Sequence, residues 1–153
     1  MSLSHVCGRG IFSFHHAIIM ACKEVAVTNR HADWFRQAEA DLRHAQNSLG
    51  AGDYEWACFA AHQAAEKALK AVFLKAGMDA WGHTLTALIG NLPENAARPG
   101  KVLIEKARML DKFYIQTRYP YAFDSGAPTD YYIQEEAQDA ISYAQSFLKF
   151  YNG

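Results

Sequence analysis

The sequence predicts an all-α protein, and three observations support this prediction. Apolar residues recur with the 3.6-residue period of a helix from Asp33 onward. One long segment is rich in alanine, the residue with the highest helix propensity. No segment shows the alternation of apolar and polar residues that is typical of a half-buried strand. The expected architecture is an up-and-down bundle of four to five helices.

Each predicted helix is bounded by its own signals. Asp33, Asp53 and Asp130 are candidate N-caps, Gly77 is a candidate C-terminal residue, and Pro120 disfavours helical backbone in the residue before it. The predicted helices, with their candidate caps, span residues 33–49, 53–76, 84–91, 101–117 and 130–150. The connection between the first two helices is short, so they should be antiparallel neighbours. The alanine-rich second helix allows close approach from several sides and is expected at the centre of the bundle.

The length, charge and cysteine content narrow the class of protein. A chain of 153 residues is long enough for one hydrophobic core and short for two, so we expect a single helical domain. Its formal charge of −1 excludes a protein that coats nucleic acid or a membrane surface through net charge. The three cysteines form no C-x-x-C motif, so the sequence predicts neither a disulfide framework nor a zinc module, and no metal or cofactor is expected.

The first 30 residues are predicted to be an N-terminal extension, and residues 31–153 the helical bundle. Residues 11–22 are largely apolar and follow Arg9, as in a signal peptide, but His15 and His16 interrupt the run and no clear A-x-A site follows. No run reaches the roughly 18 apolar residues that would span a bilayer. We therefore expect a cytoplasmic protein without a membrane partner.

Arg118 lies at the end of the fourth predicted helix among three tyrosines, Tyr114, Tyr119 and Tyr121. A guanidinium can bind a phosphate through two hydrogen bonds, and tyrosine rings can stack on a base. These residues, together with Lys112 on the same helix, are candidates for a nucleotide or phosphate site. In the alternative interpretation, Arg118 caps carbonyls of the last turn or pairs with an acidic side chain, and the tyrosines bury their rings.

Charge is distributed unevenly along the chain. Residues 98–120 carry a net charge of +4, and residues 121–153 carry −4. Lys101, Arg108 and Lys112 share one face of the fourth helix, where they could steer a phosphate-bearing ligand. The alternative is that this face is solvated and pairs with the acidic last helix.

His62 and His83 are the weak catalytic candidates, because imidazole is the usual general acid or base near neutral pH. His62 falls within the alanine-rich helix, where it could instead be a packed core residue. His83 directly precedes the third helix, where it could instead cap the helix start. Glu66 and Lys70 are spaced as an i,i+4 ion pair, which stabilises a helix by a few tenths of a kcal/mol.

Three ordered motifs resemble the HEPN domain family, over about residues 33–150. They are Gln63-Ala-Ala-Glu-Lys-Ala-Leu-Lys-Ala71, Gly82-His-Thr-Leu85 and Tyr114-Ile-Gln-Thr-Arg-Tyr-Pro120. The resemblance implies an up-and-down bundle that is usually a homodimer. It also implies nucleotide binding, a minimal nucleotidyltransferase as partner and, for some pairs, a role as a toxin–antitoxin system.

Many HEPN proteins are metal-independent ribonucleases that carry an arginine followed closely by a histidine. Arg118 matches the arginine by position, but no histidine follows it anywhere in the chain. The leading hypothesis is therefore a HEPN-type module that dimerises, binds a minimal nucleotidyltransferase and a nucleotide, and is not itself catalytic. The alternative is a ribonuclease that acts on RNA through Arg118 and a spatially adjacent histidine, His62 or His83.

Overall fold

A computed structural model describes the backbone of residues 12–153 and the side chains of residues 30–153. Within this range every regular element is a helix, as predicted, and no strand is present. The α-helices are α1 Phe12–Ala51, α2 Tyr54–Lys75, α3 Leu85–Gly90, α4 Lys101–Asp111, α5 Phe113–Gln116 and α6 Gln134–Asn152. Two short 3-10 helices, η1 Pro120–Ala122 and η2 Pro128–Asp130, lie between α5 and α6.

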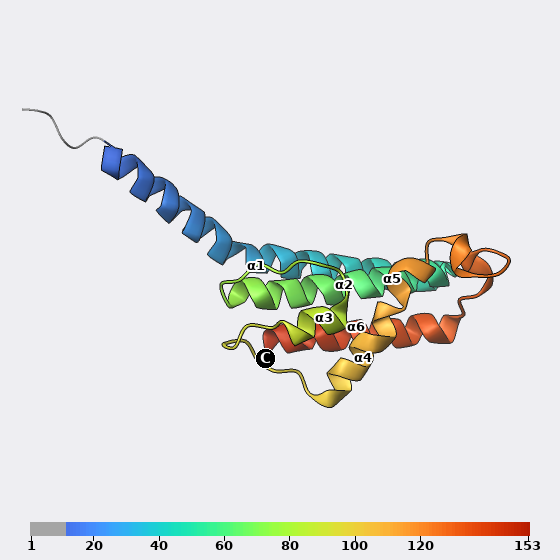
Figure 1. Cartoon of the computed structure of the whole chain (residues 1–153). Helices are drawn as coiled ribbons and strands as arrows, with labels where there is room; N and C mark the ends of the chain where they lie inside the picture. Colours follow the sequence, from blue (N-terminus) through green and yellow to red (C-terminus); the bar gives the residue numbers. More distant parts are fainter. Residues whose placement is uncertain (1–11) are drawn as a thin grey trace, which may run out of the picture.

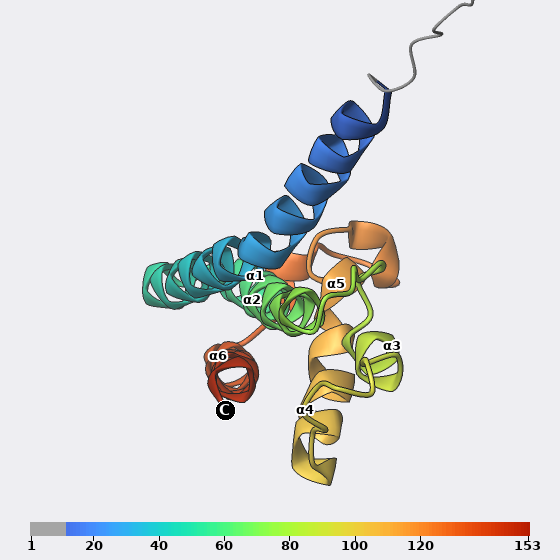
Figure 2. The same cartoon turned by 90° about the vertical axis from the view of Figure 1, so that its left-hand side faces the viewer.

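Helices α1 and α2 form an antiparallel hairpin, and α6 packs along α2 (Figure 1). The turn between α1 and α2 contains Gly52 with a φ of +86°, a left-handed conformation that favours glycine. Viewed along the helices, α3, α4 and α5 lie to the right of α6, and α4 also packs against α6 (Figure 2). The central position of α2, predicted from its alanine content, is confirmed, because fifteen of its 22 residues are buried.

Small side chains explain how closely α1, α2 and α6 pack. Alanines of all three helices are completely buried, so the backbones approach without large intervening side chains. Larger side chains, among them Leu69, Leu110 and Phe147, are also fully buried in the core. The core therefore lies around α2, and only a few side chains of α2, among them Trp56 and Phe59, reach the surface.

The first helix begins much earlier than the sequence predicted. We expected Asp33 to cap it, but α1 starts at Phe12, and Asp33 lies within the helix, where it accepts a hydrogen bond from Arg36 at 2.6 Å. No proline or glycine occurs between Phe12 and Leu49, so nothing in this stretch terminates a helix. A residue type that favours caps does not by itself start a helix when the preceding segment is also helix-compatible.

Two further boundaries differ from the prediction. The single helix expected over 101–117 is divided at Lys112 into α4 and α5, and Thr117 Oγ1 donates to the carbonyl of Phe113 at 2.6 Å in the last turn. The last helix starts at Gln134 rather than beside Asp130. Asp130 instead accepts a hydrogen bond from the Ala127 amide at 2.8 Å, which closes the turn around η2.

Candidate functional site

Three of the predicted site residues meet around the ring of Tyr114, on α5: His62, His83 and Arg118. The His83 ring stacks on it, with centroids 4.9 Å apart and an interplanar angle of 13°. The His62 ring lies 5.2 Å from the same centroid, and Arg118 Cζ lies 4.9 Å from it. Three residues from α2, the loop before α3 and the turn after α5 therefore converge on one aromatic ring.

Arg118 is held by its own helix and by three aromatic rings. Its Nε donates to the carbonyl of Tyr114 at 2.9 Å, and its Nη2 donates to the same oxygen. Its Cζ lies 4.3 Å from the centroid of Phe59 and 5.1 Å from that of Tyr119. Capping of a last-turn carbonyl was one of the two interpretations of Arg118, and it is confirmed. Pairing with a carboxylate is not observed among the described residues.

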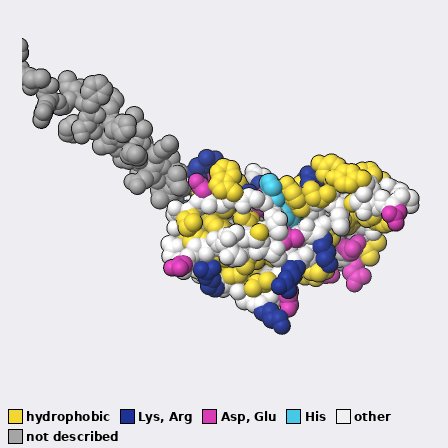
Figure 3. Space-filling model, viewed as in Figure 1, with side chains coloured by type: hydrophobic (Ala, Val, Ile, Leu, Met, Phe, Trp, Pro, Cys, Tyr) yellow, Lys and Arg dark blue, Asp and Glu magenta, His cyan; other side chains and the backbone are white. Residues whose placement is uncertain are grey.

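The aromatic side chains beside Arg118 remain partly open to solvent. Tyr119 and Tyr121 stack with their centroids 5.5 Å apart, and 77% of Tyr121 is exposed. Figure 3 shows hydrophobic side chains gathered at the end of the molecule that carries η1. The guanidinium therefore lies at the edge of an exposed aromatic surface, which we call the Arg118 surface and define by Phe59, Tyr114, Arg118, Tyr119 and Tyr121.

His83 is bonded to a buried carboxylate rather than capping α3. Its Nδ1 lies 3.1 Å from Glu66 Oε1 and 3.2 Å from Glu66 Oε2. Lys70 Nζ donates to Glu66 Oε1 at 2.9 Å. The Glu66 side chain is only 5% exposed, whereas that of His83 is 53% exposed. The arrangement presents a half-exposed imidazole on a carboxylate that is itself anchored by an ammonium group.

His62 is fully buried between two carboxylates, which agrees with the core interpretation. Its Nδ1 lies 4.0 Å from Glu66 Oε2, and its Nε2 lies 3.8 Å from Asp111 Oδ1. Both distances exceed a hydrogen bond, and Nε2 has no hydrogen-bond partner among the described residues. With no exposed surface, His62 does not touch a ligand that binds from solvent.

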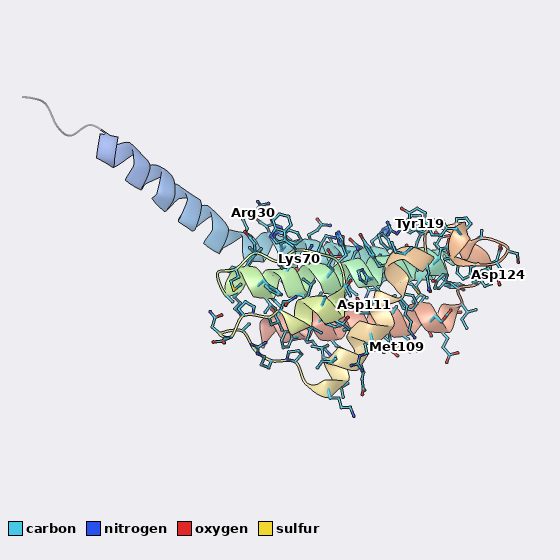
Figure 4. The ribbon with its side chains drawn as sticks, viewed as in Figure 1. Arg30, Lys70, Met109, Asp111, Tyr119 and Asp124 are labelled. Atoms are coloured by element: carbon cyan, nitrogen blue, oxygen red, sulfur yellow. The ribbon has the colours of Figure 1, made fainter. Side chains whose placement is uncertain are left out.

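Asp111 joins α4 to the start of α3. It accepts hydrogen bonds from the Leu85 amide at 2.6 Å, the Thr86 amide at 3.1 Å and the Thr86 hydroxyl at 2.7 Å. Burial alone would raise the pKa of Asp111, but the contact with His62 and these hydrogen bonds outweigh it and lower that pKa below its ordinary value. The carboxylate thus fixes the segment that carries His83. Figure 4 shows Asp111 on α4, Lys70 on α2 and Tyr119 beyond α5.

Lys112 does not join the site. It is exposed at the break between α4 and α5, and its Nζ lies 3.6 Å from the sulfur of Met109. The predicted pairing of the basic face with the last helix is also not observed within the described part of the chain. Lys106 donates to Ser146 on α6 at 2.8 Å, and Lys101 lies 3.9 Å from Glu105 of its own helix.

Glu66, Asp111 and Phe59 were not predicted as members of the site. Glu66 was interpreted only as half of an i,i+4 pair with Lys70. A stronger signal was present, because His62, Glu66 and Lys70 follow one another at i, i+4 and i+8 in an otherwise alanine-rich helix. Such a polar stripe on a buried helix indicates a built interaction rather than a solvated face.

The described residues offer neither a metal site nor a membrane span. Among them, no group of three or more His, Cys, Asp or Glu side chains could hold a metal ion. None of the helices in this part of the chain combines the length and the hydropathy needed to cross a membrane.

Comparison with known proteins places the chain in a family. The model of the HEPN domain matches residues 31–153. A crystal structure of a Thermus thermophilus protein is 51% identical with a TM-score of 0.78, over 81% of this chain and 97% of that one. An archaeal HEPN homologue is 35% identical with a TM-score of 0.69, over 82% and 97%. A HEPN domain protein of Thermotoga maritima is 37% identical with a TM-score of 0.63, over 78% and 94%.

A search of curated proteins finds no match to the chain. The family model covers the whole bundle, including the Tyr114 ring and every side chain that meets there. The helical fold and the three motifs agree with this match. The chain therefore belongs to the HEPN domain family.

Proposed function

We propose that the protein is a dimeric HEPN module that binds a minimal nucleotidyltransferase and a nucleotide, and that it is not itself catalytic. The proposal that the protein binds a nucleotide rests on the contacts of the Arg118 side chain. Its guanidinium is held by a backbone carbonyl and aromatic rings, and it has no carboxylate partner among the described residues. A cation fixed without a neutralising partner is suited to bind an anion.

The aromatic part of the Arg118 surface would supply the rest of the affinity. Tyr121 is the most exposed of its rings, and a base stacked on such a ring contributes about 1–3 kcal/mol. A phosphate on the Arg118 guanidinium and a base on Tyr119 or Tyr121 together match the two halves of a nucleotide. The absence of any histidine after Arg118 in the sequence argues against strand cleavage by this arginine with a nearby residue of its own segment.

Calorimetry with ATP, AMP and inorganic phosphate tests the nucleotide site. We expect ATP to bind and the Arg118→Ala variant to bind at least about tenfold more weakly, equivalent to about 1.4 kcal/mol. Arg36→Ala, which removes an exposed arginine of α1, is the matched control and should leave the affinity unchanged. Equal affinities of the wild type and Arg118→Ala, or no binding of any of the three probes, would refute the site.

The partner and the dimer are tested separately. A tagged chain expressed together with a minimal nucleotidyltransferase should retain it through purification, and sedimentation of the chain alone should give twice the monomer mass. A monomer at all concentrations, or loss of the nucleotidyltransferase on the first column, contradicts the corresponding part of the proposal.

A second function, metal-independent cleavage of RNA, is favoured by one observation, the His83–Glu66 pair. In this reaction His83 Nε2 would take the proton of a ribose 2′-hydroxyl as the 2′-oxygen bonds to phosphorus. The bond from phosphorus to the 5′-oxygen breaks, and that oxygen takes a proton from solvent. The products are a 2′,3′-cyclic phosphate and a 5′-hydroxyl, with Arg118 stabilising the charge on phosphorus.

Incubation of RNA with the protein in EDTA tests the second function. Cyclic-phosphate products that disappear in both His83→Ala and Arg118→Ala support it. No cleavage, or cleavage that survives His83→Ala, excludes this assignment and leaves the binding module as the better description.

A further inference from the structure

The Glu66 carboxylate is buried and lies close to nitrogen atoms of three side chains, Lys70, Gln63 and His83. Its side chain is 5% exposed and receives Lys70 Nζ at 2.9 Å, while Gln63 Nε2 lies 3.4 Å from its second oxygen. His83 Nδ1 lies within 3.2 Å of both oxygens. A carboxylate paired with an ammonium group is an acceptor only, so the imidazole must supply the proton of this hydrogen bond.

This hydrogen bond determines where the lone pair of His83 lies. When the ring is neutral it carries a single N–H, and Glu66 requires that proton on Nδ1. Nε2 is then unprotonated and can accept a proton. Parallel stacking on Tyr114 at 4.9 Å holds the plane of the ring as well.

We infer that Glu66 is a positioning residue that fixes His83 as the Nδ1–H tautomer, with Lys70 fixing Glu66, so that Nε2 is the proton-accepting atom of the site. The inference rests on the second function proposed above and selects His83 over His62. The His83 side chain is 53% exposed, whereas His62 is fully buried and cannot reach a substrate.

The tautomer can be measured without any activity. Long-range ¹H–¹⁵N NMR spectra of the full chain, with His83 assigned through loss of its signals in His83→Ala, separate the two ring nitrogens. We expect the neutral ring to show a protonated Nδ1 and an unprotonated Nε2. A neutral His83 ring with its proton on Nε2 would overturn the inference, whatever the activity of the protein.

Two variants test the role of Glu66. In Glu66→Gln the single amide oxygen is occupied by Lys70, so the amide NH₂ faces His83 Nδ1 and should move the proton to Nε2. Glu66→Asp keeps the charge, but its side chain is shorter by one methylene, so the carboxylate no longer reaches His83. The neutral His83 ring should then no longer be restricted to the Nδ1–H tautomer. Glu105→Gln, which neutralises an exposed glutamate of α4, is the control and should leave the His83 spectrum unchanged.

If RNA is cleaved, the same variants separate positioning from general structure. Glu66→Gln should lower kcat by about 100-fold with little change in KM, because the proton acceptor is lost while binding is retained. An unchanged kcat in a variant whose tautomer has switched would overturn the catalytic role of Nε2. Absence of cleavage by the wild type refutes the second function, and with it the proton-accepting role of Nε2, while the spectra still decide whether Glu66 sets the tautomer.

Discussion

At the scale of single residues, the site depends on side chains that are held before any ligand arrives. Arg118 makes both of its described side-chain hydrogen bonds to one carbonyl, and its guanidinium lies against Phe59, Tyr114 and Tyr119. An arginine held in this way loses little additional freedom when an anion binds. Lysine could not replace it, because an ammonium group lacks the planar donor array that reaches a carbonyl and an anion together.

A second residue-scale feature is the buried thiol of Cys58, on α2. Burial, together with the negative charges of Glu136 and Glu55, raises its pKa to about 12. At pH 8 only about one thiol in 10⁴ is then a thiolate, the form that reacts with alkylating agents. We predict that iodoacetamide leaves Cys58 unmodified in the native protein and modifies it in urea.

Peptide mass spectrometry measures Cys58 separately from the other two cysteines. The matched comparison is the same protein alkylated at the same pH with and without urea. Labelling of native Cys58 at a rate close to that in urea would show that α2 opens to solvent far more often than its burial implies.

At the scale of elements, α2 serves both the core and the site. Its alanines pack against α1 and α6, while one stripe carries His62, Glu66 and Lys70 toward α5 and the loop before α3. The polar stripe is tolerated within a buried helix because Glu66 bonds both to Lys70 of the same helix and to His83 of the loop before α3. Any change that moves α3 relative to α2 should therefore disturb His83.

The link between α3 and α4 through Asp111 makes stability depend on pH. The pKa of Asp111 is lower in the folded protein than in the unfolded chain, so its contribution is present above about pH 4 and is lost as the pH falls through the folded pKa. We predict that Asp111→Asn lowers the free energy of unfolding by about 2 kcal/mol at pH 7, because bonds to a charged acceptor are weakened.

Urea unfolding at pH 7 and at pH 3 measures this effect. The difference between the wild type and Asp111→Asn should narrow at pH 3, because this pH lies below the ordinary pKa of about 3.9 that Asp111 has in the unfolded chain. Asp139→Asn, at an exposed position of α6, should leave the free energy of unfolding unchanged at both pH values. A difference that stays constant between the two pH values would mean that the amide itself disturbs packing.

At the scale of the whole molecule, the sequence was sufficient for the fold class but not for all its boundaries. Helical periodicity and alanine content report which faces are buried, so the bundle and the central position of α2 were predicted correctly. Caps act locally and are overridden by neighbouring residues, which is why the starts at Asp33 and Asp130 were wrong. The break at Lys112 has no signal in the residue types around it.

The site was predictable only in part, for a physical reason. Arg118 and its tyrosines are close in sequence, so a motif contains them. The contact of His83 with Glu66 joins residues 17 positions apart through the turn after α2, and Asp111 reaches Leu85 from 26 positions away. Such contacts depend on how α3 is placed, which no local pattern encodes.

The boundary between extension and bundle yields the last prediction. The family match begins at residue 31, and every described core side chain lies at or after Phe35. His31 Nδ1 lies 2.8 Å from the Tyr151 hydroxyl, which ties this point of α1 to the end of α6. We predict that a chain of residues 31–153 folds and melts within about 3 °C of the full chain, since no described core contact is removed.

Thermal unfolding followed by circular dichroism measures this difference. The matched control is a chain of residues 44–153, which loses Phe35, Ala38 and Leu42 and with them a large part of the α1 face that covers α2. That chain should fail to show a cooperative transition. The free energy lost by removing several buried side chains exceeds the free energy of unfolding of a typical domain, which is roughly 5–15 kcal/mol. If residues 31–153 melt far below the full chain, the first 30 residues belong to the folded unit, and the bundle is larger than the family match suggests.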